Sequence, residues 1–264
     1  MLTGIDHLVI AVPDLDAAVD RLGRELGIAA GGGGTHPGLG TANRIAWFGD
    51  SYLELITVTD RGLTAGSWLG GPTQRLLDER GGGFVGYALT SDDLAADLAR
   101  LRAGGSTLSG PVPGERRRPD GAVARWTLGI PELVGPTAPP FLIEHDTGEA
   151  EWTASERAAR AHARHPAGGP LRLAGLEISM VAPTRVAVAY RRAVGLHAEP
   201  WLAGGDWTLA VRVGAQQVVL APADLSSEPT VTVRLAGPDV RPIDAELFAC
   251  RFVIGPDDGS PGSA

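Results

Sequence analysis

The chain has 264 residues and repeats one order of predicted elements, which constrains its fold more than any single motif does. In the first copy, residues 5–12 form a β-branched run that predicts a strand. Residues 15–27 have apolar side chains at helical spacing, and Asp14 is the expected N-cap. After a Gly-rich segment, runs at residues 43–48 and 51–58 predict a β-hairpin, and we assign the order βαβββ.

The same order returns in a second copy, at a period of about 80 to 90 residues. A strand is predicted at residues 84–90, and an amphipathic helix follows at residues 92–105. Strands near Val123–Leu128 and Phe141–Glu144 complete this copy. We expect the two copies to pair in space.

A third copy begins near residue 171, and a fourth is truncated. The segment Leu173–Glu177 aligns with the segment Leu2–Asp6, and both strands end at a proline before a helix. Strands are predicted at residues 207–213 and 217–221, and only two strand-like runs follow, with no clear helix. We therefore predict an α+β fold in which tandem βαβββ units form curled mixed sheets around a cleft, with a third, degenerate unit.

Changes in composition set the expected boundaries between these units. The stretch after the second copy is polar and Ala-rich, which is typical of a helical connector between lobes. The last residues are rich in Gly, Ser, Pro and Asp, as in a frayed chain end. We predict a domain of two βαβββ units at residues 1–150, a helical connector at 151–170, a degenerate third unit with a partial fourth at 171–255, and a flexible tail at 256–264.

Charge and cysteine content exclude several classes of function. Lys and Arg number 23 against 31 Asp and Glu, and the positive residues are scattered, so we expect no nucleic-acid partner. No segment approaches the roughly 20 apolar residues of a membrane span, so we expect no membrane partner. Cys250 is the only cysteine and lies in an apolar run, which favours a buried thiol in a reducing compartment. We therefore expect a cytoplasmic protein.

Four phrases of the sequence resemble the glyoxalase-like branch of the vicinal oxygen chelate superfamily. They are GIDHLVIAVPDLDAAVDRL, THPGLGTANRIAWFGDSYLELI, RRRPDGAVARW and PFLIEHD, all within residues 1–170. The first phrase is widespread in the superfamily, whereas HPGLGTAN and RRRPDG are more particular to this branch. The resemblance implies that paired βαβββ units curl around a cleft and that metal ligands point inward from the first and last strands of each unit.

This resemblance implies a divalent metal site. His7 lies on the first strand and Glu54 on the last strand of the first unit, where the superfamily carries ligands. An imidazole and a carboxylate suit zinc, nickel, cobalt, iron or manganese. In the second unit, residues 84–87 offer no ligand, while Glu144 and His145 lie on opposite faces of the last strand. Which of the two faces inward is left open by the register, and His145 is taken as the third metal ligand.

Other polar residues are candidates for substrate chemistry. His36, expected in a loop, replaces the missing ligand or acts as a general base beside Glu54, unless it only caps local backbone. Asn43 orients a substrate carbonyl or closes a turn, and Arg118 anchors a carboxylate or phosphate or belongs to a solvated basic loop. We expect the remaining histidines to cap helices or to lie at the surface: His162, His165 and His197.

Two classes of function follow from these residues. The first is a metal-dependent lyase, isomerase or hydrolase that acts on a small carbonyl compound. The alternative is a metal-free protein that binds an antibiotic or metabolite, which the incomplete ligand set favours. Either function implies a small-molecule substrate or ligand as partner, and the repeated units also allow a homodimer.

Overall fold

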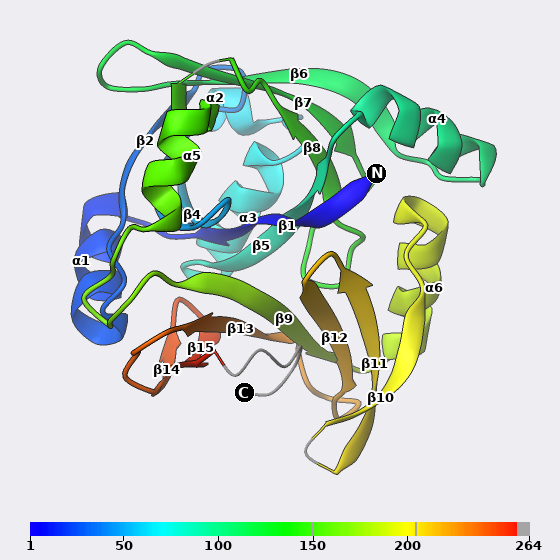
Figure 1. Ribbon diagram of the computed structural model, residues 1–264. Coiled ribbons are helices and arrows are strands. Elements are labelled where there is room, and N and C mark those ends of the chain that lie inside the picture. Colours follow the sequence, from blue (N-terminus) through cyan, green and yellow to red (C-terminus); the bar gives the residue numbers. More distant parts are fainter. Residues whose placement is uncertain (149, 204, 258–264) are drawn as a thin grey trace.

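Eight strands close into a barrel in the computed structural model, which describes residues 1–148, 150–203 and 205–257. Each of the first two βαβββ units supplies four of these strands. Figure 1 shows the barrel above a second, seven-stranded sheet formed by the rest of the chain. In chain order the strands are β1 (Leu2–Ala11), β2 (Gly31–His36), β3 (Thr41–Phe48), β4 (Ser51–Val58), β5 (Gly83–Ser91), β6 (Ser109–Arg117), β7 (Val123–Ile130) and β8 (Phe141–His145).

The order of strands around the barrel reflects the sequence repeat. It is β1-β4-β3-β2-β6-β7-β8-β5, so the first strands of the two units are neighbours. Each first strand pairs in parallel with the last strand of its own unit, β1 with β4 and β5 with β8. The predicted fold class, with tandem βαβββ units in curled mixed sheets, is confirmed.

The helix of the first unit begins where the sequence predicts, and that of the second unit begins two residues later than predicted. In the first unit α1 (Leu15–Leu26) follows Asp14, whose side chain accepts a hydrogen bond from Ala17 N, and it ends at Gly27 in the left-handed region. In the second unit Asp93 caps α4 (Leu94–Ala103) in the same way. The two helices therefore begin at corresponding points after β1 and β5.

Two helices between the units lie outside the predicted pattern. They are α2 (Arg61–Thr64) and α3 (Gly70–Arg80), and the latter opens with Gly-Gly-Pro, which hides the helical pattern. Trp68, Leu69 and Leu76 of this segment pack against the apolar residues inside the barrel. The segment therefore covers one end of the barrel interior, near Ala11 of β1.

A β-bulge in β1 determines which side chains enter the barrel. Opposite β5, Ile5 pairs with Leu89 and His7 pairs with Ala88, so Asp6 is the extra residue. Beyond the bulge, Leu8 packs in the apolar core outside the barrel, whereas Val9 packs inside it. The alternation of β1 therefore directs His7 inward.

The second sheet extends the repeat at lower regularity. It follows a connector made of a 3₁₀ turn at Ala150–Trp152 and α5 (Ala154–Ala161). A helix, α6 (Pro183–Val194), follows its first strand, and no helix follows β13 within residues 230–257. The strands are β9 (Arg172–Met180), β10 (Ala198–Ala203), β11 (Asp206–Val213), β12 (Gln216–Pro222), β13 (Thr230–Gly237), β14 (Ile243–Leu247) and β15 (Cys250–Pro256), in the order β10-β11-β12-β9-β13-β15-β14.

One continuous core joins the barrel to the second sheet. It contains Leu8 of β1, Leu22 of α1 and Leu176 of β9, all buried. Cys250 is also buried in this core, as its apolar surroundings in the sequence predict. None of the helices in the described ranges is both long and apolar enough to cross a membrane.

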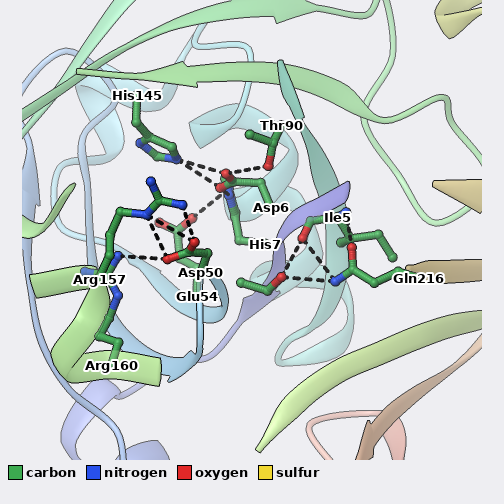
Figure 2. Close-up of polar contacts among 11 residues, drawn as sticks. Ile5, Asp6, His7, Asp50, Glu54, Thr90, His145, Arg157, Arg160 and Gln216 are labelled. Carbon is green, nitrogen blue, oxygen red and sulfur yellow. Dashed lines mark hydrogen bonds and ion pairs between the residues drawn. The ribbon is translucent and has the colours of Figure 1, made fainter. Parts of the chain in front are cut away.

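Gln216 ties the two sheets together by hydrogen bonds. Its Oε1 accepts from Ile5 N, and its Nε2 donates to Ser51 Oγ at 3.0 Å and to Leu173 O at 3.2 Å. Figure 2 shows this side chain reaching β1 from the second sheet. Its neighbour Gln217 is buried, and both polar atoms of its side chain lack a partner among the described residues.

His165 ties the connector to the barrel, and the expectation that it caps a helix or lies at the surface is wrong. The side chain is buried, Nδ1 accepts from Ala29 N at 3.1 Å, and Nε2 donates to Trp47 O at 2.9 Å. This pattern requires the neutral ring, because a proton on Nδ1 would face the N–H of Ala29. Burial lowers the pKa of His165 and outweighs the opposing hydrogen bond to Trp47.

We predict opposite effects of the same substitution at two neighbouring glutamines. Gln216→Leu should lower the free energy of unfolding by about 2 to 4 kcal/mol, because it leaves Ile5 N–H and Leu173 C=O without their partner at the seam. Gln217→Leu should be neutral or stabilising, because it removes buried polar atoms that lack partners. Urea denaturation of both variants checks this, and equal losses would contradict it.

We also predict that the His165 tether weakens in mild acid. The pKa of His165 is lower in the folded chain than its value of about 6.5 in the unfolded chain. The stabilisation of the fold by neutral His165 is therefore complete above about pH 6.5, and it is lost as the pH falls from that value toward the folded pKa. In urea denaturation between pH 7.5 and pH 5, His165→Gln should lose less stability than the parent. The matched variant His197→Gln, at an exposed position, should retain the parent's pH dependence.

Candidate functional site

Three polar side chains meet inside the barrel, and we call them the inner cluster. His7 comes from β1, His36 from the end of β2 and Glu54 from β4, and none is more than 5% exposed. Nε2 of His7 lies 3.6 Å from Oε2 of Glu54, and Nε2 of His36 lies 3.8 Å from Oε1 of Glu54. Both imidazoles therefore face one carboxylate.

The loop position predicted for His36 is wrong, because the Gly-rich segment before it forms a strand. His36 ends β2 and pairs with Thr41 of β3. Gly33 lies at a φ of +79°, and a Cβ there would overlap the backbone carbonyl of Asn43. Glycine at this position lets β2 lie close to β3, which brings His36 to the cluster.

The other ring nitrogen of each imidazole contacts a buried oxygen. Nδ1 of His7 donates to Oδ1 of Asp6 at 2.6 Å, and Nδ1 of His36 lies 3.0 Å from Oγ1 of Thr41. Burial alone would raise the pKa of Asp6, but attraction and hydrogen bonds from His145 and His7 outweigh burial and hold this pKa well below its usual value. The hydrogen bond from Nδ1 to Asp6 holds the ring of His7 so that Nε2 faces Glu54.

Burial keeps His36 neutral. It lowers the pKa of this imidazole to about 4, against the attraction of Glu54, and the positive charge of Arg116 adds to the lowering. At neutral pH one ring nitrogen of His36 therefore has a free lone pair.

Asn43 of β3 links the backbone of β2 to the carboxylate of the cluster. Its Oδ1 accepts from Gly34 N at 2.9 Å, and its Nδ2 donates to Oε1 of Glu54 at 2.8 Å. The same Nδ2 lies 3.4 Å from Nε2 of His36. These contacts hold Glu54 between the two imidazoles.

Aromatic rings pack tightly around the inner cluster. Tyr52 stacks on His7 with ring centroids 4.5 Å apart, Phe141 meets the same ring edge-on at 5.3 Å, and Trp126 lies edge-on to His36. The remaining cavity has a volume of about 30 Å³. That space holds about one water or one ion, so a substrate reaches the cluster only if side chains move.

The second unit carries no counterpart of His7 and Glu54. His7 lies seven residues before the N-cap of its helix, and Gly86 occupies the same place before Asp93. Glu54 pairs with Val9 of β1, and in the second unit Phe141 pairs with Ala88 of β5, the residue that corresponds to Val9. Two of the four expected ligand positions therefore hold residues that cannot bind a metal.

The alternation of β8 separates Glu144 from His145. Glu144 points outward, and its Oε2 accepts from Leu94 N at the start of α4 at 2.8 Å. His145 points toward the barrel, where its Nε2 lies 3.1 Å from both carboxylate oxygens of Asp6. Figure 2 shows Asp6 between His145 and His7, so the third predicted ligand meets the inner cluster only through Asp6.

A different arginine from the predicted one reaches the cavity. Arg118 is partly exposed and pairs with Asp120 at 2.7 Å and with Glu151 at 3.6 Å, outside the wall of the inner cavity. Arg116 is buried in that wall and forms an ion pair with Glu151. The sequence gives no signal for which of the consecutive arginines lines the cavity, because that depends on which side of β6 faces the barrel interior.

The inner cluster fits a divalent ion in donor type and in pairwise spacing. Two ligands about 2.1 Å from the same ion are at most about 4.2 Å apart, and both imidazole–carboxylate pairs lie within that limit. Across residues 1–148, 150–203 and 205–257, no three or more His, Cys, Asp or Glu side chains are grouped as a complete ion site. The spacing of His7 and Glu54 and the spacing of His36 and Glu54 therefore each fit a shared ion. A complete site requires that all three side chains bind the same ion.

We predict that Asn43→Asp destabilises the protein. This isosteric change removes the donor at 2.8 Å from Glu54 and places a second carboxylate there, so we expect a loss of at least about 2 kcal/mol at pH 7. The loss should shrink at pH 5, because a shared proton relieves the repulsion. Thermal denaturation at the two pH values checks this, and an equal loss at both would contradict it.

Comparisons with known proteins agree with this architecture. The model of the glyoxalase-like domain family matches residues 5–194. A search of curated proteins finds no match.

Solved structures share the fold at low sequence identity. A hypothetical protein from Staphylococcus aureus is 16% identical, with a TM-score of 0.78 over 97% of this chain and 100% of that one. A mutant 4-hydroxymandelate synthase from Streptomyces coelicolor is 15% identical, with a TM-score of 0.55 over 90% of this chain and 72% of that one. Methylmalonyl-CoA epimerase from Mycobacterium tuberculosis is 24% identical, with a TM-score of 0.42 over 54% and 88% of the two chains.

Proposed function

The chain belongs to the glyoxalase-like domain family of the vicinal oxygen chelate superfamily, and we propose that it is a metal-dependent enzyme acting on a small carbonyl compound. The observation that carries this proposal is the convergence of His7, His36 and Glu54 inside the barrel. Burying two imidazoles and a carboxylate costs more free energy than burying apolar side chains of similar size would. Function explains its presence better than stability does.

The inner cluster supplies the donors for the metal. Nε2 of His7, Nε2 of His36 and the carboxylate of Glu54 suit zinc, nickel, cobalt, iron or manganese. We propose His36 in place of His145 as the third ligand, because Nε2 of His145 is already bonded to Asp6. A bound divalent ion polarises the oxygens of a substrate and stabilises negative charge that develops on them.

The residues around the cluster position the reacting groups. Asp6 orients His7, Thr41 orients His36 and Asn43 orients Glu54, each through a contact of 3.0 Å or less. Glu54 is the proposed base, because its carboxylate lies at the centre of the cluster and can take a proton from a carbon beside a carbonyl group. The aromatic walls exclude water, which strengthens these electrostatic contacts.

Binding without chemistry is the second candidate function. Gly86 and Phe141 stand where the second unit would supply ligands, and this favours a cleft that binds a metabolite without a metal. Both candidates imply a small-molecule partner. The cytoplasmic location, the homodimer and the domain boundaries remain predictions.

Metal content separates the two candidates. We expect about one equivalent of divalent metal per chain after dialysis, and its loss in His7→Ala, His36→Ala and Glu54→Ala, measured by elemental analysis. His197→Ala is the matched control, because it removes an exposed imidazole, and His145→Phe should also retain the metal. A parent chain that stays metal-free after reloading would rule out the metalloenzyme and leave the binding function.

A positive result leads to a search for activity. Dicarbonyl and hydroxycarbonyl compounds are the first substrates to test, with proton exchange at the carbon beside the carbonyl as the readout. Glu54→Gln should reduce exchange by at least about a hundredfold, because it removes the proposed base. Exchange that survives in a folded Glu54→Gln variant would contradict the role of Glu54.

A further inference from the structure

Arg116 is a buried cation in the wall of the inner cavity, and the proposed function gives it no role. The residue is 4% exposed. A guanidinium group remains charged at neutral pH, so its burial is costly unless a partner compensates for the lost water. Among the described residues its hydrogen-bond partner is the carboxylate of Glu151 in the connector, and Nε of Arg116 has none. The guanidinium group therefore keeps donor capacity that the fold does not use.

The close approach of β2 and β6 directs Arg116 toward the inner cluster. Gly34 and His36 lie on the same face of β2, because alternate residues of a regular strand share a face. A Cβ on Gly34 would lie 3.1 Å from Cγ of Arg116 and would overlap the backbone carbonyl of Arg117. Glycine at this position leaves space for the side chain of Arg116 on the face of β2 that carries His36.

The positive charge of Arg116 acts on two other side chains of the cavity wall. Burial has the largest effect on the pKa of His36, which it lowers, and the charge of Arg116 lowers this pKa further. Burial raises the pKa of Tyr52, and the same charge opposes that rise. His36 and Tyr52 both line the inner cavity, so the charge is close to the space that a substrate would enter.

The contacts of Glu151 allow Arg116 to exchange its partner. Arg118 lies 3.6 Å from the other carboxylate oxygen of Glu151, so Glu151 would keep a cation if Arg116 released it. A ligand carboxylate would then give Arg116 an ion pair of the same kind. The inner cavity of about 30 Å³ also requires that side chains move before a substrate enters, and displacement of Glu151 is one such movement.

We propose that Arg116 binds a carboxylate of the substrate, and that the substrate is a small acid with its carbonyl group beside the carboxylate, as in a 2-oxo acid. The two groups are close together because Arg116 and the inner cluster line one small cavity. The position of the carbonyl group at the cluster rests on the proposed function. Glu151 competes with the substrate carboxylate for Arg116, and Arg116 takes the anchoring role that the sequence suggested for Arg118.

The test is an NMR titration of the full ¹⁵N-labelled chain, both as purified and after loading with zinc. Pyruvate and pyruvamide are the probes, because they have nearly the same shape and only pyruvate carries a carboxylate. The indole N–H of Trp126, which lines the inner cavity, reports binding. We expect pyruvate to bind at least about ten times more tightly than pyruvamide, because a charged ion pair replaces a neutral contact.

Two single variants distinguish a substrate anchor from an ion pair that only supports the fold. Arg116→Met keeps an apolar stem without the charge, and we expect it to weaken pyruvate binding at least about tenfold. Glu151→Gln removes the competing carboxylate, and we expect it to tighten pyruvate binding by about threefold or more. A purely structural pair predicts weaker binding in both variants, because each leaves a buried charge without its partner.

Two further variants complete the test. Arg117→Gln is the matched control, because it removes one positive charge from the exposed face of β6 and should bind pyruvate as the parent does. The double variant Arg116→Met with Glu151→Leu removes both charges together, which a protein tolerates better than the loss of one partner. It covers the case in which Arg116→Met fails to fold, and it should lose the preference for pyruvate over pyruvamide.

Three results would overturn the proposal. The first is a folded parent that prefers pyruvate to pyruvamide neither as purified nor with zinc. The second is unchanged or weaker pyruvate binding in folded Glu151→Gln. The third is parent-like pyruvate binding in the folded double variant. Metal content is measured separately, so a chain that takes up no metal but binds pyruvate through Arg116 would contradict the proposed enzyme and support the carboxylate anchor.

Discussion

The hydrogen bonds of the buried Asp6 carboxylate are the interactions on which the arrangement of the barrel interior depends. The carboxylate joins three strands, because it accepts from His7 of β1 and His145 of β8 and from Thr90 of β5. Two histidines and one hydroxyl together offset the cost of burying its charge, and its pKa remains well below the usual value. Asp6 thus orients the imidazole of His7 toward the inner cluster and holds the imidazole of His145 from the opposite side.

The two units share a fold but place different side chains inside the barrel. The backbone repeats, since each first strand pairs with the last strand of its unit and each helix begins at an aspartate cap. The interior does not repeat, because Gly86 and Phe141 stand where the first unit has His7 and Glu54. Main-chain hydrogen bonds form the sheet with many different side chains, so the interior residues of the two units can differ while the fold is the same.

The sequence was most informative about local structure and least informative about contacts between distant strands. The cap at Asp14 followed from local pattern, whereas the inward position of His7 followed from the resemblance to the superfamily. The strand position of His36 was missed, because four glycines hide a strand that only the close approach of β2 to β3 explains. The burial of His165 was also missed, since its partners Ala29 and Trp47 lie more than a hundred residues away in the chain.

By itself, the sequence determined the repeated βαβββ order and the caps of the first helix, because these depend on periodicity and short-range hydrogen bonds. The expectation that His7 and Glu54 face inward came from the resemblance to the superfamily. Only the tertiary structure decided that His36 joins this pair and that Asp6 lies between His7 and His145. It also decided that Arg116 rather than Arg118 lines the cavity. The physical reason is that a β-bulge and barrel closure set which side chains share a face, and neither leaves a periodic signal in the sequence.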